Sequence, residues 1–241
     1  MAIKDQIVVV TGGGRGIGRA IVVAFAKQGA RLAVCARTKS EIEAAAAKAR
    51  SLGAEAVAVP LDLTNESSVN KMVRTVEEKL GPIDILINNA GVALFKPFLD
   101  TTPEEWDQLM DINAKGIFLC CRAVLPGMMK RRRGRIINVS SSAGKKGYPE
   151  QSAYCASKHA VQGLSKVLAL ETQGHGIRIH VICPGGVDTE LVRQGRDDVD
   201  LSKYMRPEEI AEIAVFLASQ DSTAMVDEIT VRRLEAGPWS C

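Results

Sequence analysis

The stretch "IVVVTGGGRGIGRA", residues 7–20, joins a short β-branched run to a glycine-rich loop and the start of a helical pattern. Glycines at 12, 16 and 18 let the chain turn sharply, bring backbone N–H groups against a pyrophosphate and seat a helix closely on a sheet. Because the loop lies between a strand and a helix, it predicts a dinucleotide-binding turn. Its expected cofactor-binding residues are Gly12, Gly14, Arg15, Gly16, Ile17 and Gly18.

The same alternation of strand and helix continues along the chain. Near-continuous apolar runs predict strands at 7–10, 31–36, 56–60, 83–89, 135–140, 178–183 and, less clearly marked, 228–233. Helical patterns lie between them, among others at 15–28, 40–51, 66–80 and 152–171, with another expected after Pro207. Continuously apolar strands indicate a parallel sheet buried on both faces, so we expect an α/β, doubly wound fold with ligands at the carboxyl ends of its strands.

The composition predicts one ordinary globular domain over residues 1–241. Apolar residues make up 46% of the chain and charged residues 24%, with a net charge of +3, which disfavours a nucleic-acid-binding module. The basic run at 130–135 could bind phosphate or an acidic protein, but we interpret it as a solvated turn. The N-terminus lacks a signal-peptide pattern, and no window approaches 18 uninterrupted apolar residues, so we expect a cytoplasmic protein without a membrane partner.

The six cysteines show neither a C-x-x-C pair nor a histidine cluster at metal-ligand spacing. We therefore expect buried free thiols, with no disulfide and no metal site. Cys155 and Cys183 adjoin candidate site residues, but packing is the default interpretation and no chemistry is assigned to them.

The residues after the second predicted strand indicate which dinucleotide is bound. An NAD site of this kind usually carries Asp or Glu there to bind the adenosine ribose, whereas this chain has Ala36 followed by Arg37. A carboxylate would repel a 2′-phosphate, while Arg37 can bind one bidentately and Arg15 could reach it from the other side. The sequence therefore predicts NADP(H) in preference to NAD(H). Asp62 is a candidate acceptor for the adenine amino group, although an Asp at a strand end also commonly caps a helix.

Six motifs in order resemble the short-chain dehydrogenase/reductase family over nearly the whole chain. They are "TGGGRGIG" at 11–18, "NNAG" at 88–91, the Asn of "DINAKG" at 113, the serines of "IINVSSS", "YCASK" at 154–158 and "PGGVDT" at 184–189. The resemblance implies a Rossmann fold of about seven strands in the order 3-2-1-4-5-6-7. It also implies hydride transfer between nicotinamide and a carbonyl or secondary alcohol.

The resemblance assigns the catalytic roles residue by residue. Tyr154 becomes the general acid/base, Lys158 lowers its pKa and binds the cofactor ribose, and Ser141 orients the carbonyl oxygen. Asn113 would hold a proton-relay water. The family's spacing selects Ser141, the middle one of the three serines.

The chemistry suits these residue types. Tyr154 and Lys158 stand at i and i+4, so a helix starting near Ser152 places both on one face. A free tyrosine has a pKa of about 10, and lowering it by about three units needs roughly 4 kcal/mol, within reach of a close cation in a partly dry site plus a second charge. On its own, an i, i+4 Tyr–Lys pair would more often be a surface pair.

The resemblance also extends the cofactor site along the other strand ends. Asn88 and Ala90 would support the cofactor and the central sheet, and Val187 and Thr189 would meet the nicotinamide carboxamide. The full expected set adds Leu63, Asn89, Gly91, Pro184, Gly185, Tyr154 and Lys158 to the residues already named.

One region leaves the substrate unidentified, and another departs from the family pattern. The polar segment 190–206 is expected to form a lid, and it identifies no substrate. Many members end in a "VDGG"-like turn, whereas this chain reads "VDEITVRRLEAG" at 226–237, which puts the usual C-terminal subunit contact in doubt. Tetramers through the helices that carry Asn113 and Tyr154 are nevertheless the expectation.

Three functions stay open at the sequence level. Much of the chain resembles 3-oxoacyl-[acyl-carrier-protein] reductases, although Leu170 stands where those proteins tend to carry a basic residue, and carrier docking would depend on Arg131, Arg132 and Arg133. Reduction of an unrelated small ketone, aldehyde or sugar is the broader alternative. A non-catalytic dinucleotide sensor or scaffold is the alternative from another class.

Overall fold

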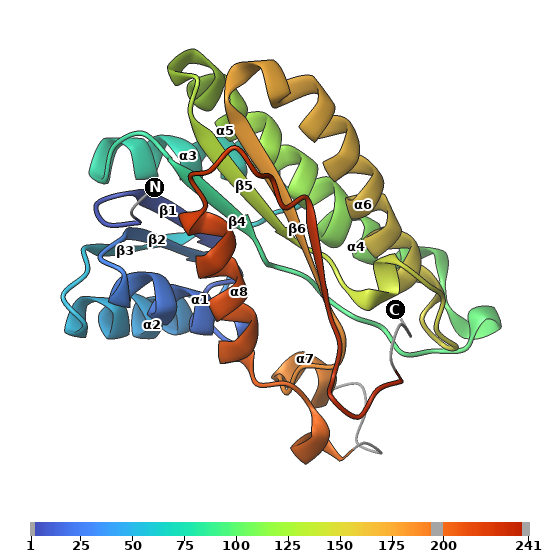
Figure 1. The fold of residues 1–241 in the computed structure, drawn as a ribbon. Coiled ribbons are helices and arrows are strands. Elements are labelled where there is room, and N and C mark those ends of the chain that lie inside the picture. Colours follow the sequence, from blue (N-terminus) through green and yellow to red (C-terminus); the bar gives the residue numbers. More distant parts are fainter. Residues whose placement is uncertain (1–2, 194–199, 238–241) are drawn as a thin grey trace.

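The computed structural model describes residues 3–193 and 200–237, and within them a seven-stranded parallel sheet carries helices on both faces (Figure 1). The strand order is β3-β2-β1-β4-β5-β6-β7, as the sequence predicted. The strands are β1 (Ile7–Thr11), β2 (Arg31–Ala36), β3 (Ala56–Pro60), β4 (Ile85–Asn88), β5 (Gly134–Val139), β6 (Ile177–Pro184) and β7 (Glu228–Val231).

The central strands are buried on both faces, which explains their unbroken apolar sequences. All five residues of β1 are buried, and Val9 is paired in register with Ala33 of β2 and Leu86 of β4. Alternate residues of each strand enter opposite cores, so Val8 and Val10 pack on one side and Ile7 and Val9 on the other. A strand with two apolar faces cannot show the polar alternation of a half-exposed strand.

The described residues form eight α-helices. They are α1 (Gly16–Lys27), α2 (Lys39–Ser51), α3 (Glu66–Lys79), α4 (Pro103–Met110), α5 (Gly116–Arg131), α6 (Ser152–Thr172), α7 (Glu190–Arg193) and α8 (Pro207–Ser219). Figure 1 shows α1, α2 and α8 on one face and α3, α5 and α6 on the other, and each group contributes side chains to its own hydrophobic core. Short α7 lies beyond the carboxyl ends of the strands.

A π-helical turn, Asp111–Lys115, joins α4 to α5 and was not expected from the sequence. The joined run from 103 to 131 is long enough and apolar enough to cross a membrane by length and composition alone, but half of its most apolar window is buried inside the fold. We interpret it as a core helix. π-turns inside α-helices occur often at functional sites, and this one contains Asn113.

The basic run ends α5. Lys130 and Arg131 occupy the last helical turn, where cations favour the negative end of the helix dipole, and Arg132 adopts a left-handed conformation with φ of +51°. Its side chain donates to the Gly174 carbonyl, Arg131 donates to the Ile83 carbonyl, and Arg133 lies 3.7 Å from Asp84. The predicted turn is therefore present, with its arginines bound to the protein's own surface.

The strand ends differ slightly from expectation for identifiable reasons. β4 starts at Ile85 because the Asp84 carboxylate accepts a hydrogen bond from the Ile7 N–H. It stops at Asn88 because the next two N–H groups, of Asn89 and Ala90, bond to the Thr11 hydroxyl.

Five of the six cysteines are described, at 35, 120, 121, 155 and 183, and all are buried free thiols. Cys241 and the middle of the expected lid, residues 194–199, lie outside the described residues.

Candidate active site

A cleft of about 260 Å³ lies at the carboxyl ends of the strands. It is lined by residues that follow six different strands, from Gly12 after β1 to Val192 in α7. Of the predicted cofactor residues, all but Gly18 line it: Gly12, Gly14, Arg15, Gly16, Ile17, Arg37, Asp62, Leu63, Asn89, Ala90, Gly91, Tyr154, Lys158, Pro184, Gly185, Val187 and Thr189. Ser141 lines it as well, and Asn113 lies behind it.

The glycine loop has the shape needed to receive a dinucleotide. Gly12 and Gly16 have φ angles of +64° and +51°, and a Cβ at Gly12 would lie 2.8 Å from the Ala90 Cα. Helix α1 starts at Gly16 with no side-chain cap, so its first N–H groups face the cleft as an anion site. The residues therefore fit the pyrophosphate of a dinucleotide cofactor.

Gly18 has a packing role and does not line the cleft. A Cβ there would lie 2.1 Å from the Gly12 carbonyl oxygen, a backbone atom that cannot move aside cheaply. Gly18 thus lets α1 lie against the loop, which is the helix-seating role expected of a third glycine, while its expected direct contact with cofactor has no support in the cleft lining.

The "NNAG" motif splits between sheet and cleft. The Asn89 side chain donates to the carbonyls of Thr11 and Gly12 at 3.1 and 3.2 Å, which ties β4 to the glycine loop. Asn88 points into the interior and donates to Asn138 on β5 at 2.9 Å. Asn88 therefore supports the sheet, and Asn89 and Ala90 shape the cofactor cleft.

Two charged groups line the cleft where the sequence predicted the adenosine end of the cofactor. Arg37 and Asp62 both line it, and hydrogen bonds from Thr64, with a smaller contribution from the Arg37 charge, hold the pKa of Asp62 below its usual value. The Asp62 carboxylate accepts from the N–H and hydroxyl of Thr64, whereas the cap of α3 is Asn65. Asp62 thus stabilises a local turn and does not cap a helix.

Arg15 lies across the cleft mouth. Its guanidinium is 2.8 Å from the carboxylate of Glu190, which begins α7, and both side chains are about half exposed. The sequence reasoning missed Glu190 as a cleft residue because the two side chains are 175 positions apart and only the tertiary fold joins them.

Ser141 caps a short 3₁₀ turn beside the cleft. Its hydroxyl accepts from the Ala143 N–H at 3.1 Å and lies 3.4 Å from the Pro184 carbonyl. The neighbouring serines have other partners: Ser140 donates to the Lys158 carbonyl, and Ser142 bonds to the Tyr148 hydroxyl. Of the three serines, Ser141 therefore has its hydroxyl at the cleft beside Tyr154.

Tyr154 and Lys158 stand on one face of α6, as the i, i+4 spacing predicted. The Lys158 ammonium lies 5.8 Å from the Tyr154 ring centroid and donates to the Val139 carbonyl at 3.1 Å. Burial lowers the pKa of Lys158 to about 8. Burial also raises the pKa of Tyr154, against the opposing effect of a hydrogen bond with Ser141.

The expected lowering of the Tyr154 pKa by Lys158 is therefore not found in the protein alone. Burial of the phenol dominates its pKa, and the Lys158 ammonium is directed to the Val139 carbonyl.

Asn113 is fully buried in the π-helical turn. Its amide oxygen accepts from the Val92 N–H, and its two amide hydrogens go to the Val92 carbonyl and the Ser157 hydroxyl. A Cβ at Gly91 would lie 3.1 Å from the Asn113 oxygen and 3.6 Å from the Lys158 ammonium. Asn113 thus fixes the loop after β4 beside Lys158.

The "PGGVDT" loop closes the far side of the cleft. Val187 is buried and lines it, and a Cβ at Gly16 would touch the Thr189 side chain at 3.3 Å. The loop and the glycine turn are therefore in near contact across the cleft.

Several lining residues were not predicted. Ile112 and Ser140 adjoin predicted residues in the sequence and Val139 precedes Ser140, so their proximity could have been anticipated, whereas Glu41 reaches the cleft from the first turn of α2. No sequence motif marks Glu41.

Comparison with known proteins agrees with this arrangement. The family model described as short chain dehydrogenase matches residues 6–200. The 3-oxoacyl-[acyl-carrier-protein] reductase of Synechocystis sp. is 34% identical, covering 93% of this chain and 94% of that protein. A protein described as inactive 2-(S)-hydroxypropyl-CoM dehydrogenase 2, from Xanthobacter autotrophicus, is 40% identical over 81% of this chain and 90% of its own length.

Two further matches are a much longer protein and a solved structure. The chain is 33% identical to glycine betaine reductase ATRR of Emericella nidulans over 95% of its residues but spans only 19% of that protein. Among solved structures, a metagenomic short-chain oxidoreductase in complex with NADP superposes with a TM-score of 0.84 at 33% identity, covering 97% of this chain and 99% of that chain. The fold, the cleft and these matches agree, and the chain belongs to the short-chain dehydrogenase/reductase family of oxidoreductases.

Proposed function

We propose that this protein is a cytoplasmic, NADP(H)-dependent carbonyl reductase or alcohol dehydrogenase with Tyr154 as its general acid/base. The observation that carries the proposal is that Ser141, Tyr154 and Lys158 line the same cleft as the glycine loop. A bound nicotinamide supplies or accepts the hydride.

The chain's own residues then handle the substrate oxygen. Ser141 hydrogen-bonds the carbonyl oxygen and stabilises the negative charge that develops on it, and Tyr154 donates a proton to the same oxygen. Lys158 binds ribose hydroxyls and adds positive charge near the phenol.

Proton resupply would pass behind Lys158. Both amide hydrogens of Asn113 bond within the protein, so a relay water held there would use the remaining lone pair of the amide oxygen or a main-chain carbonyl of the π-turn. We propose Asn113 as the residue that positions this relay.

The preference for NADP(H) rests on charge at the adenosine end. Arg37 lines the cleft where a 2′-phosphate would lie, and Ala36 replaces the carboxylate that would repel it. Arg15 is a second cation within the same cleft. A 2′-phosphate would have to compete with the Glu190 carboxylate to bind it.

Reduction of an acyl-carrier-bound substrate is the narrower alternative, supported by the similarity to 3-oxoacyl-[acyl-carrier-protein] reductases. Within one protomer, the contacts made by the arginines expected to dock a carrier disfavour this alternative. Arg131 and Arg132 donate to backbone carbonyls and Arg133 pairs with Asp84, near the amino end of β5 and away from the cleft. We therefore favour a small free carbonyl compound.

A change of Tyr154 to Phe tests the proposal. We expect Tyr154→Phe to lose at least a hundredfold in kcat for NADPH-dependent reduction of a carbonyl panel that includes an acyl thioester, while NADPH still binds. Tyr148→Phe removes another phenol hydroxyl six residues away and should change kcat only a few fold. Undiminished turnover in Tyr154→Phe contradicts the mechanism, and NADPH binding without oxidation by any carbonyl favours the sensor.

A further inference from the structure

The C-terminal segment, which lacks the glycines of the family's "VDGG"-like ending, carries two successive arginines, Arg232 and Arg233, directly after β7. Arg232 donates from one nitrogen to the carbonyls of Arg233, Leu234 and Ala236, at 3.1, 3.1 and 2.7 Å. The Ala236 N–H also bonds to the Arg233 carbonyl at 3.0 Å. Arg232 thus organises residues 232–236 into a defined turn directly after β7.

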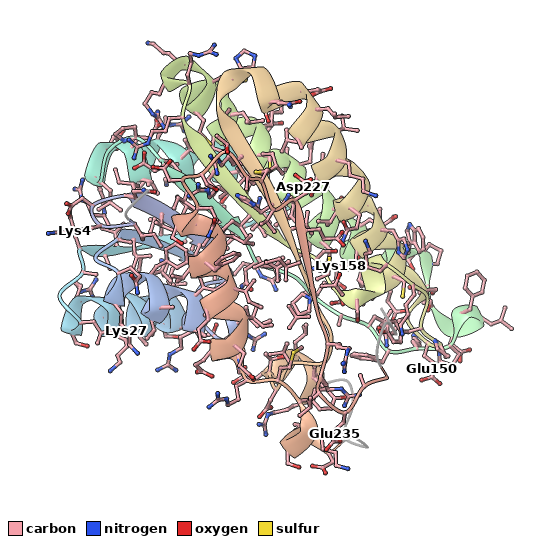
Figure 2. All side chains as sticks on the ribbon, in the orientation of Figure 1. Lys4, Lys27, Glu150, Lys158, Asp227 and Glu235 are labelled. Carbon is pink, nitrogen blue, oxygen red and sulfur yellow. The ribbon has the colours of Figure 1, made fainter. Side chains whose placement is uncertain are left out.

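This turn contacts the end of the lid segment. The guanidinium of Arg233 lies 4.5 Å from the centroid of the Tyr204 ring, a cation–π distance. Lys203 Nζ lies 3.7 Å from the carboxylate of Glu235, and Figure 2 shows Glu235 beside the short helical segments at the carboxyl edge of the sheet. Two successive lid residues, Lys203 and Tyr204, are therefore paired with the turn.

The Tyr204 ring in turn packs on the loop that closes the cleft. A Cβ at Gly186 would lie 2.6 Å from an edge carbon of the ring, so the ring fills the space above this glycine. The Met205 N–H donates to the Gly186 carbonyl at 3.1 Å, and Met205 forms a parallel bridge with Val187.

The same loop is also held by β7. The Gly185 N–H donates to the Val231 carbonyl at 2.7 Å, immediately before the two arginines. Residues 184–189 are thus fixed from β7 on one side and from Tyr204 and Met205 on the other. Val187 and Thr189 of this loop line the cleft at its proposed nicotinamide end.

We propose that the Arg233–Tyr204 contact is a positioning clamp that holds the 184–189 loop against the nicotinamide half of the cofactor. The inference rests on the proposed function, because it takes that loop as the nicotinamide site. The guanidinium fixes the ring, the ring fixes Gly186, and Gly186 fixes the residues that set the angle and distance of hydride transfer. Displacements well below 1 Å at such a position affect rate strongly.

The clamp predicts that the variants lose binding affinity only for ligands that carry the nicotinamide half of the cofactor. In Arg233→Met and in Tyr204→Leu, we expect NADPH to bind about three- to tenfold more weakly and kcat to fall by a similar factor. Adenosine 2′,5′-bisphosphate, which lacks the nicotinamide half, should bind to both variants within twofold of wild type. The fluorescence of bound NADPH reports the nicotinamide environment and should shift toward that of free NADPH.

Conservative and control variants separate positioning from folding. Tyr204→Phe keeps the ring and should retain most of the wild-type NADPH affinity, and the double variant Arg233→Met/Tyr204→Leu should lose little more than either single one. Arg206→Met alters an exposed arginine two residues beyond Tyr204 and should have no effect. Circular dichroism melts verify that each variant is folded.

The outcomes distinguish this inference from the proposed function. Unchanged NADPH affinity in Arg233→Met overturns the clamp, and so does an equal loss of adenosine 2′,5′-bisphosphate affinity, which would indicate general loosening. If wild type binds NADPH but reduces no carbonyl, the proposed function fails while the two binding comparisons still decide the clamp. If wild type binds neither ligand, both are overturned.

Discussion

Lys158 carries a charge that the fold must bury. It is 4% exposed, bonds to the Val139 carbonyl, and has a pKa lowered to about 8 by burial. A sequence can place Lys158 one helical turn from Tyr154, but it cannot show how strongly burial shifts the pKa of either side chain. Desolvation depends on every residue that packs around the pair, so the rise in the Tyr154 pKa could not be predicted from the spacing.

The buried lysine predicts a specific pH dependence of stability. Below about pH 8 Lys158 is charged in both states, and burial of that charge opposes folding in full. Between pH 8 and 10.5 the folded state releases the proton first, so the lysine's penalty falls as pH rises. At pH 7 Lys158→Met should be more stable than wild type by up to about 3 kcal/mol, a gap that shrinks toward pH 9.5.

Denaturant unfolding at several pH values measures that difference directly. Lys166→Met alters an exposed lysine on the same helix and should leave the free energy of unfolding within about 0.5 kcal/mol of wild type at each pH. A gap for Lys158→Met that is constant with pH would contradict the burial argument.

The charge of Arg37 is expected to determine the preference for NADPH over NADH. Arg37→Ala removes the cation expected to meet the 2′-phosphate, so the KM for NADPH should rise about tenfold or more while the KM for NADH changes little. Steady-state kinetics with both cofactors measure the ratio. A wild-type preference for NADH, or an equal rise in both constants, would contradict the assignment.

At the scale of the elements, α1 and its loop show what sequence alone can and cannot predict. The apolar runs located all seven strands, because strands buried on both faces leave an unbroken apolar signature. The motif also located the cleft. It could not separate Gly18, which seats the helix, from Gly12 and Gly16, which shape the cleft, since all three are glycines at family spacing.

The Arg15–Glu190 pair and the Arg233–Tyr204 contact were beyond sequence reasoning for a different reason. Each joins segments that only the tertiary fold brings together, and of these four residues only Arg15 stands in a quoted motif. β7 was the least certain strand, and its end at Val231 is set by the turn that Arg232 organises.

Two glycine-to-alanine changes contrast packing with helix propensity. Gly18→Ala places a methyl group against the Gly12 carbonyl, so it should destabilise the protein by about 2 kcal/mol or more and weaken NADPH binding. Gly163→Ala, in the interior of α6 with open space around it, should stabilise by about 0.5–1 kcal/mol. Chemical denaturation compares the two, and equal effects would refute the packing role of Gly18.

At the scale of the whole molecule, three apolar side chains are exposed on α5 and α6. Phe118, Val167 and Leu170 are 45%, 52% and 76% exposed on the helices through which we propose a homo-oligomer, a dimer or tetramer. The C-terminal segment lacks the family's usual glycines, so we expect contact through α5 and α6 to carry the assembly.

Sedimentation velocity tests this expectation. Wild type should sediment as a dimer or tetramer, and Val167→Glu/Leu170→Glu should shift it toward monomer. Leu52→Glu adds one charge at an exposed leucine after α2 and should leave the assembly intact. A wild-type protein that is monomeric at micromolar concentration would count against the proposal.

The cleft gathers its lining from residue 12 to residue 192, at the ends of strands joined by long crossovers. Contacts of such large sequence separation form late and slowly, after the loops between them have closed. A chain still being synthesised cannot assemble this cleft until residue 192 has emerged. A cofactor that contacts both ends of this cleft would bind only the folded chain, and its binding would therefore stabilise the folded state.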